Sequence, residues 1–126
     1  MLQIDQETIV NIVRILGSTT AVPTTSGPGG SATATVTRVA TNAANVTLLA
    51  ANANRRGATI FNNSPGGANL FVKFGTTANI GAGTESYTVK IANGGYYEVP
   101  FGYTGRIDGI WDAADANGEA LITELT

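Results

Sequence analysis

Short runs of alternating apolar and polar residues, separated by clusters of Gly, Pro, Asn and Ser, fill the chain from residue 35 onward. Successive side chains of a strand point to opposite faces, so this alternation predicts half-buried β-strands. Eight strands are predicted: Thr35–Thr41, Asn45–Ala51, Gly57–Asn63, Ala68–Gly75, Glu85–Ile91, Gly95–Val99, Gly105–Ala113 and Gly118–Leu125. Strands this short and closely spaced predict an all-β fold, an antiparallel β-sandwich or jelly-roll-like domain.

The segment from Gly94 to Trp111 is where the core is expected, because it holds three of the four tyrosines and the only tryptophan. After a turn at residues 102–105, Ile107, Gly109 and Trp111 fall on one face of a strand, which predicts that Trp111 is buried in the core. Further on, Asn117-Gly118 is typical of a turn that closes a hairpin between the last two strands.

Residues 1–16 follow a different pattern, in which apolar residues recur at helical spacing. They predict a short helix that starts near Asp5 and stops at Gly17, with a β-arm as the alternative. So short a helix is marginal alone and needs a surface to pack on. The residues expected to provide that contact are Ile9, Ile12, Val13 and Leu16. Residues 17–34 have the composition of a linker, which leaves 35–126 as the β-domain.

Several motifs of the β-domain occur together and in order: Val46–Asn52, Arg55–Ser64, Gly94–Trp111 and Leu121–Leu125. In this order they resemble a β-domain of virion structural proteins of tailed bacteriophages. The resemblance covers roughly residues 46–126 and does not reach the N-terminal segment. It implies a place in the virion more clearly than a particular role there.

Composition limits the possible partners. The chain has 126 residues, enough for one domain, and only 13% of them are charged, with a net charge of −2. No basic stripe is visible, so nucleic-acid binding is not expected. No apolar run approaches the length of a membrane span, so no membrane partner is expected. The many Thr, Asn, Gly and Ala residues suit a polar, uncharged surface, as found where protein copies contact one another.

The residues expected for catalysis are missing. The chain has no histidine and no cysteine, which removes the commonest general base, the usual nucleophile pairs and most transition-metal sites. Residues 112–119 have oxygen ligands near a glycine, but their spacing does not fit a calcium loop. Glu98 and Asp108 would suit a glycosidase pair, yet any protein with this many carboxylates offers such a pair. We therefore expect no enzyme activity, no cofactor and no metal site.

Self-association is predicted from the uncharged surface and from the strand edges that a sandwich leaves open. Arg55 and Arg56 are expected to lie in a loop, where they would pair with Glu98 or Asp108 of a neighbouring subunit. A homotrimer is favoured over a dimer, because capsid lattices offer three-fold positions.

Together, the residues and the resemblance predict a non-enzymatic virion structural protein. The favoured role is a capsid decoration or cement protein on the outer surface of the phage head, assembled in the host cytoplasm. Its N-terminal residues would bind the major capsid protein, and each copy would reinforce contacts between neighbouring coat subunits. The alternative is a tail, neck or head-fibre module that binds a host-surface receptor. An exposed patch of Tyr and Trp would favour receptor binding, whereas a buried one would favour packing.

Overall fold

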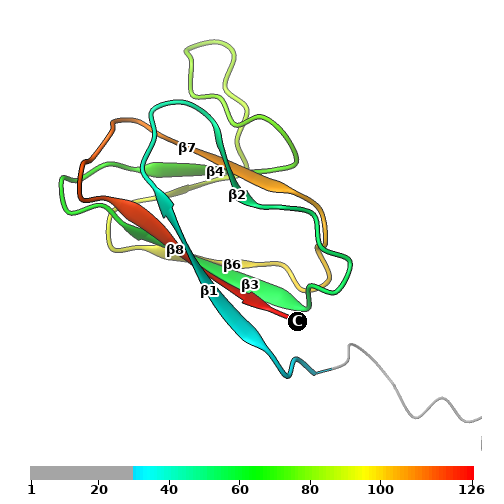
Figure 1. Cartoon of the computed structure of the whole chain (residues 1–126). Helices are drawn as coiled ribbons and strands as arrows, with labels where there is room; N and C mark the ends of the chain where they lie inside the picture. Colours follow the sequence, from blue (N-terminus) through cyan, green and yellow to red (C-terminus); the bar gives the residue numbers. More distant parts are fainter. Residues whose placement is uncertain (1–29) are drawn as a thin grey trace, which may run out of the picture.

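The computed structural model describes residues 30–126, which form strands and no helix (Figure 1). All eight predicted strands are present, most of them shorter than expected: β1 (Ala34–Ala40), β2 (Val46–Leu49), β3 (Gly57–Asn63), β4 (Leu70–Phe74), β5 (Val89–Ile91), β6 (Tyr96–Val99), β7 (Ile107–Trp111) and β8 (Glu119–Leu125). The predicted helix or arm in residues 1–16 lies outside the described residues. Within 30–126, no helix long and apolar enough to cross a membrane is found.

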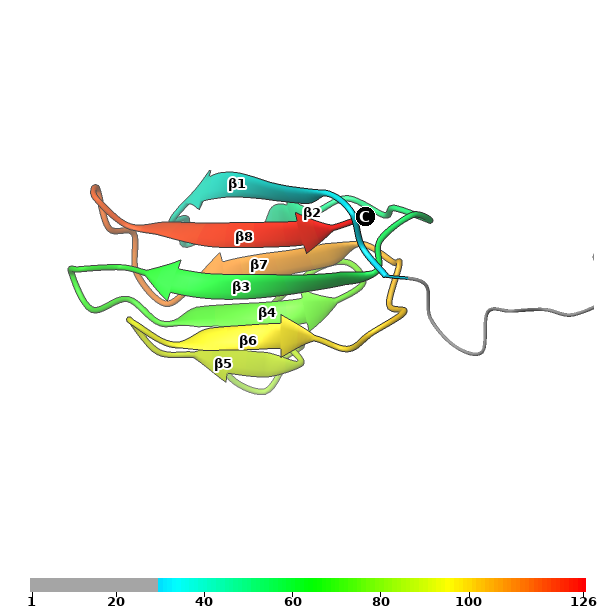
Figure 2. The same ribbon diagram turned by 90° about the horizontal axis from the view of Figure 1, so that it is seen from below.

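The strands form two antiparallel sheets that pack face to face (Figure 2). Sheet A has the order β1-β8-β3-β6, and sheet B has the order β2-β7-β4-β5. Only β4 and β5 are neighbours both in the chain and in a sheet, so the other connections cross between sheets, as in a jelly roll. The prediction of a sandwich or jelly-roll-like domain is confirmed. The strand order of the two sheets is that of a jelly roll.

The predicted final hairpin is wrong, because β7 and β8 belong to different sheets. Gly118 does take part in a turn, in which its N–H donates to the carbonyl of Asp115. That turn carries the chain from sheet B to sheet A. The start of the domain also differs from the prediction. Ala32 and Thr33 already donate backbone hydrogen bonds to Thr126, so the end of the predicted linker belongs to the folded domain.

Alternating side chains from both sheets fill the core, whose largest fully buried members include Ile60, Leu70, Ile107, Trp111 and Ile122. The prediction that Trp111 is a core residue is confirmed. Gly109 lies between two aliphatic side chains of the core, where an added Cβ would come within 2.7 Å of the Leu48 side chain. Only glycine therefore fits this position of β7.

One polar network is buried among these apolar side chains. The Asn62 amide nitrogen donates to the carbonyls of Ala68 and Ile91, both at 2.9 Å. Its amide oxygen accepts hydrogen bonds from the Ser64 hydroxyl and the Trp111 indole nitrogen. In residues 30–126, no buried side-chain nitrogen or oxygen lacks a hydrogen-bond partner. The network avoids the cost of burying unpaired polar groups.

The outer faces of the two sheets differ. The long connection between β4 and β5 covers part of the outer face of sheet B (Figure 1). Its Ala78 is buried and donates its N–H to the side chain of Asn45, and Ser86 hydrogen-bonds to Lys73 of β4. Residues 85–88 belong to this connection, which is why β5 is shorter than predicted. No comparable connection within residues 30–126 crosses the outer face of sheet A (Figure 2).

Candidate interaction surface

The outer face of sheet A is the candidate functional site. In β3 and β8, residues that point into the core alternate with residues that point away from it. The strand register aligns the outward residues in rows across the four strands. One row contains Tyr96, Phe61, Leu121 and Arg38, and the next contains Glu98, Thr59, Thr123 and Val36. Tyr96 is 69% exposed and Val36 is 63% exposed, so large apolar groups on this face contact solvent.

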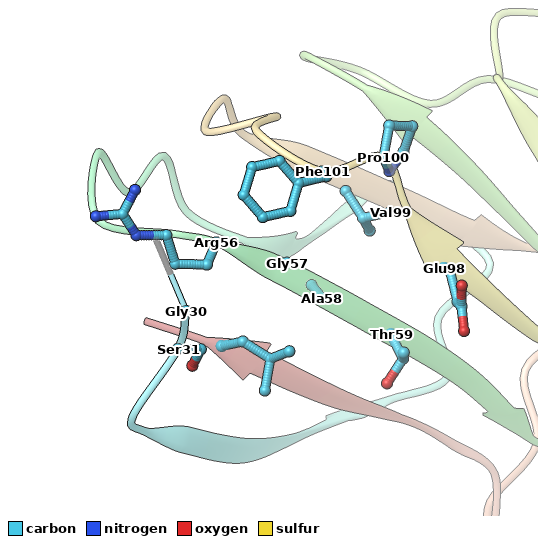
Figure 3. A pocket seen from close by; sticks show the side chains of 11 residues that line it. Gly30, Ser31, Arg56, Gly57, Ala58, Thr59, Glu98, Val99, Pro100 and Phe101 are labelled. Atoms are coloured by element: carbon cyan, nitrogen blue, oxygen red, sulfur yellow. The ribbon is translucent and has the colours of Figure 1, made fainter. Parts of the chain in front are cut away.

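A groove of about 570 Å³ lies at one end of this face (Figure 3). Its lining includes Leu125 at the end of β8 and the segment Val99–Phe101, which begins with the last residue of β6. Phe101 is 59% exposed. Gly30 and Ser31 also line the groove, so the chain enters the described domain at its rim (Figure 3). The groove and the rows of sheet A form one surface, here called the sheet A face.

The predicted subunit contact at Arg55 is wrong, because this side chain is buried within the domain. Its Nε lies 2.7 Å from Glu124 Oε1 of β8. The terminal nitrogens donate to the carbonyls of Gly105, before β7, and Ala50, after β2. The guanidinium thus joins three segments at one end of the sandwich and has no surface left for a second subunit.

The predicted contact at Asp108 is wrong for the same reason. Asp108 is fully buried on the outer side of sheet B, beneath the β4–β5 connection. Arg106 donates to both carboxylate oxygens, at 2.6 and 3.1 Å, and Asn45 donates to one of them. The hydrogen bond to Asp108 raises the pKa of Arg106. A carboxylate held in this way is also unsuited to act as a glycosidase acid or base.

The other two predicted contact residues, Arg56 and Glu98, are exposed and line the groove on the sheet A face (Figure 3). Within residues 30–126, neither makes an ion pair. Their predicted role in contacts between subunits stays a prediction. A partner seated in the groove would meet a positive charge at Arg56 and a negative charge at Glu98.

The acidic turn after β7 uses its carboxylates for local structure. Asp112 accepts hydrogen bonds from the backbone and side-chain nitrogens of Asn69, and Asp115 accepts from the backbone of Gly66. Burial acts to raise the pKa of Asp112, but the hydrogen bonds from Asn69 outweigh it and hold that pKa below its usual value. In the described part of the chain, no three acidic side chains are grouped to hold a metal ion.

The aromatic residues divide into two sets. Trp111 is buried, and Tyr97 and Tyr103 pack against Phe74, with a Phe74–Tyr103 ring separation of 4.6 Å. Tyr96 and Phe101 instead extend from the sheet A face. Most of the aromatic cluster therefore serves packing, and two members remain available to a partner. The predicted attachment residues Ile9, Ile12, Val13 and Leu16 lie outside the described residues.

Comparison with known proteins found no matching family model, no similar curated protein and no similar solved structure.

Proposed function

We propose that the protein is a non-enzymatic structural protein of a phage virion, a decoration or cement protein on the outer surface of the head. It would bind the major capsid protein and reinforce contacts between neighbouring coat subunits. The observation that carries this proposal is the exposed apolar sheet A face, which includes Val36, Tyr96 and Phe101. Among residues 30–126, these are three of the four large hydrophobic side chains that are strongly exposed.

Several properties of the sheet A face suit a protein partner. Exposed apolar groups that share one face of a small domain mark an interaction surface more often than isolated ones do. Aromatic side chains at the centre of an interface supply much of its binding energy. The low charge of the chain also suits association, because few charged groups must lose water on contact.

The N-terminal segment is proposed to contact the same partner. Residues 1–29 join the domain at the rim of the groove, where Gly30 and Ser31 lie. An anchor formed by Ile9, Ile12, Val13 and Leu16 would therefore leave the domain beside its apolar surface. Two linked contacts raise the overall affinity, because the second forms at a high effective concentration once the first is made.

Co-sedimentation with phage heads assembled without this protein tests the proposal. The variant with both Tyr96→Ser and Phe101→Ser should lower the bound fraction at least about tenfold, as expected for the loss of two interface aromatics. Tyr87→Ser is the matched control, because Tyr87 is 42% exposed but packs on Phe71 of sheet B. The proposal fails if the wild type does not bind heads. Equal loss in the double variant and the control would exclude the sheet A face.

The anchor is tested separately by replacing Ile9, Ile12, Val13 and Leu16 with serine in the full chain. We expect the β-domain to stay folded and the occupancy on heads to fall. Unchanged occupancy would show that these residues are not the anchor.

Receptor binding by a tail, neck or head-fibre module is the second candidate, and the exposure of Tyr96 and Phe101 favours it. The same variants distinguish the two roles. A decoration protein would lose head binding when these aromatics are replaced. A receptor-binding module would stay in the virion and lose adsorption to host cells. As a non-enzymatic protein it should release no product from host cell-wall polymers, and any such release would contradict the proposal.

A further inference from the structure

The free edge of β1 is the longest regular strand edge in the described domain. β1 has seven residues, ends the strand order of sheet A and pairs with β8 in an unbroken register. Figure 2 shows it at the outer margin of its sheet. Every residue of β1 except Val39 is exposed, because little of sheet B packs beneath this strand. Among residues 30–126, no strand pairs with the outer edge of β1, which therefore presents unpaired backbone groups and two solvent-exposed faces.

The other three sheet edges are protected in the usual ways. β6 has four residues and runs into Pro100, and β5 has three residues that include Lys90. β2 has four residues and pairs irregularly with β7 between Thr47 and Leu49. β1 has no proline, lysine or bulge. Its one charged residue, Arg38, lies 3.7 Å from Glu119 on β8, which offsets part of its charge.

The hydrogen bonds at the two ends of β1 show which of its backbone groups are free. Thr33 and Thr126 exchange both of their backbone hydrogen bonds, and Thr41 donates to Gly118 at the other end of the ladder. In an antiparallel ladder such pairs alternate with non-hydrogen-bonded pairs. The residues of β1 that bond to β8 therefore have odd numbers. The N–H and C=O groups of Ala34, Val36, Arg38 and Ala40 point to the free edge.

We propose that this edge pairs with β1 of a second copy of the chain, antiparallel about a two-fold axis at Thr37. Thr37 is the midpoint of Ala34–Ala40, so all seven residues of each strand would pair. Val36 would lie opposite Arg38 of the second copy and Ala34 opposite Ala40, which satisfies each free backbone group. Centring the contact on Arg38 instead would place two arginines opposite each other, which is unfavourable.

This contact has a consequence for the sheet A face. The two sheets would join edge to edge into one sheet of eight strands, with both sheet A faces on the same side. A partner with two-fold symmetry could then bind both copies, which adds the advantage of bivalency. A two-fold contact gives a dimer, so the inference competes with the trimer expected from the sequence. It concerns the described domain alone and does not depend on a role in the virion.

Charge substitutions at Val36 test the pairing with the full chain. Val36 is 63% exposed and its N–H is not bonded to β8, so substitution should leave the fold intact. Val36→Lys would place a positive charge opposite Arg38 of the other copy, and the two-fold axis repeats this repulsion. The dimer dissociation constant should therefore rise about tenfold. Val36→Glu, the matched control, would face the same arginine with opposite charge and keep the dimer. The difference between the two variants should shrink at high salt.

Sedimentation velocity at micromolar concentration should show the wild type and Val36→Glu at twice 12.9 kDa, with Val36→Lys shifted toward the monomer. A wild type that stays monomeric overturns the proposal. If its Val36 and Arg38 amides are then protected from hydrogen exchange, another part of the chain covers the edge. A dimer that persists equally in both variants, or a trimer, also overturns it.

A cysteine substitution tests the position of the axis, since the chain contains no cysteine. A non-hydrogen-bonded pair places its Cα atoms about 4.5 Å apart, within the range that a disulfide can bridge. Thr37→Cys should therefore form a disulfide-linked dimer under mild oxidation. Thr47→Cys, at the exposed residue of β2 on the edge of sheet B, should not. Equal cross-linking of the two variants, or none in Thr37→Cys, would contradict pairing at Thr37.

Discussion

The side chain of Asn62 connects three parts of the interior: the turn before β4, the end of β5 and the indole of Trp111 on β7. All of its polar atoms are buried, so each of these hydrogen bonds replaces one that water would make in the unfolded chain. Asn62 is thus a residue of the folded interior, although asparagine in a motif is more often interpreted as a surface or turn residue.

Asn62→Ala should lower the free energy of unfolding by about 3 kcal/mol, because it leaves the Trp111 indole and two carbonyls without their partner. Asn63→Ala is the control, since Asn63 points out of the core and makes no side-chain hydrogen bond within residues 30–126. It should change stability by less than about 0.5 kcal/mol. Urea denaturation measures both. Equal effects would contradict the assigned role of Asn62.

Trp111→Ala should destabilise the domain by about 3–5 kcal/mol, because a fully buried indole leaves a large cavity. A loss of this size approaches the total stability of a small domain, so the variant should be largely unfolded at physiological temperature. Circular dichroism and thermal melting measure it. A folded variant that had lost only partner binding would reverse the assignment of Trp111 to the core.

At the scale of the elements, the strands were predictable and several of their environments were not. Alternation alone indicates which residues of β7 face the core, because the period of a strand is two. The burial of Asp108 on the opposite face depends on the β4–β5 connection, which no local pattern predicts. Arg55 was misassigned because its ion pair joins residues 69 positions apart. One signal was present: Glu124 follows Ala120 and Ile122 on an inward face, where a carboxylate needs a cation.

Arg55→Ala should cost about 3–5 kcal/mol of stability, because it leaves Glu124 and several carbonyls without their buried partner. Arg56→Ala is the control on the adjacent exposed residue and should be nearly neutral for folding. Both are measured by chemical denaturation together with sedimentation. If Arg55→Ala left stability unchanged and altered only self-association, the original interface prediction would be restored.

The link between β4 and β7 through Asp112 and Asn69 should depend on pH. The pKa of Asp112 is lowered in the folded state, from a reference value of 3.8. A lowered pKa contributes stability above the unfolded-state pKa, and this contribution is lost as the pH falls through the folded-state value. Asp112→Asn should therefore be less stable than the wild type at pH 7, and the difference should shrink as the pH falls through the lowered pKa of Asp112. A constant difference across this range would contradict the assignment.

At the scale of the whole molecule, the fold class was predictable because eight short alternating segments leave few arrangements other than a sandwich or barrel. The strand order was not, since a jelly roll pairs strands that are distant in sequence, such as β1 with β8. The predicted hairpin between β7 and β8 failed for this reason. The sheet A face could not be predicted from the sequence either, because its rows combine residues from four separate strands.

Cryo-electron microscopy of phage heads incubated with the full chain tests the central claim most directly. The account predicts density for the jelly roll on the outer surface of the shell, with the sheet A face and its groove against the major capsid protein. Sheet B and its β4–β5 connection should face solvent. Heads without added density, or a domain bound through sheet B with Tyr96 and Phe101 exposed to solvent, would contradict it.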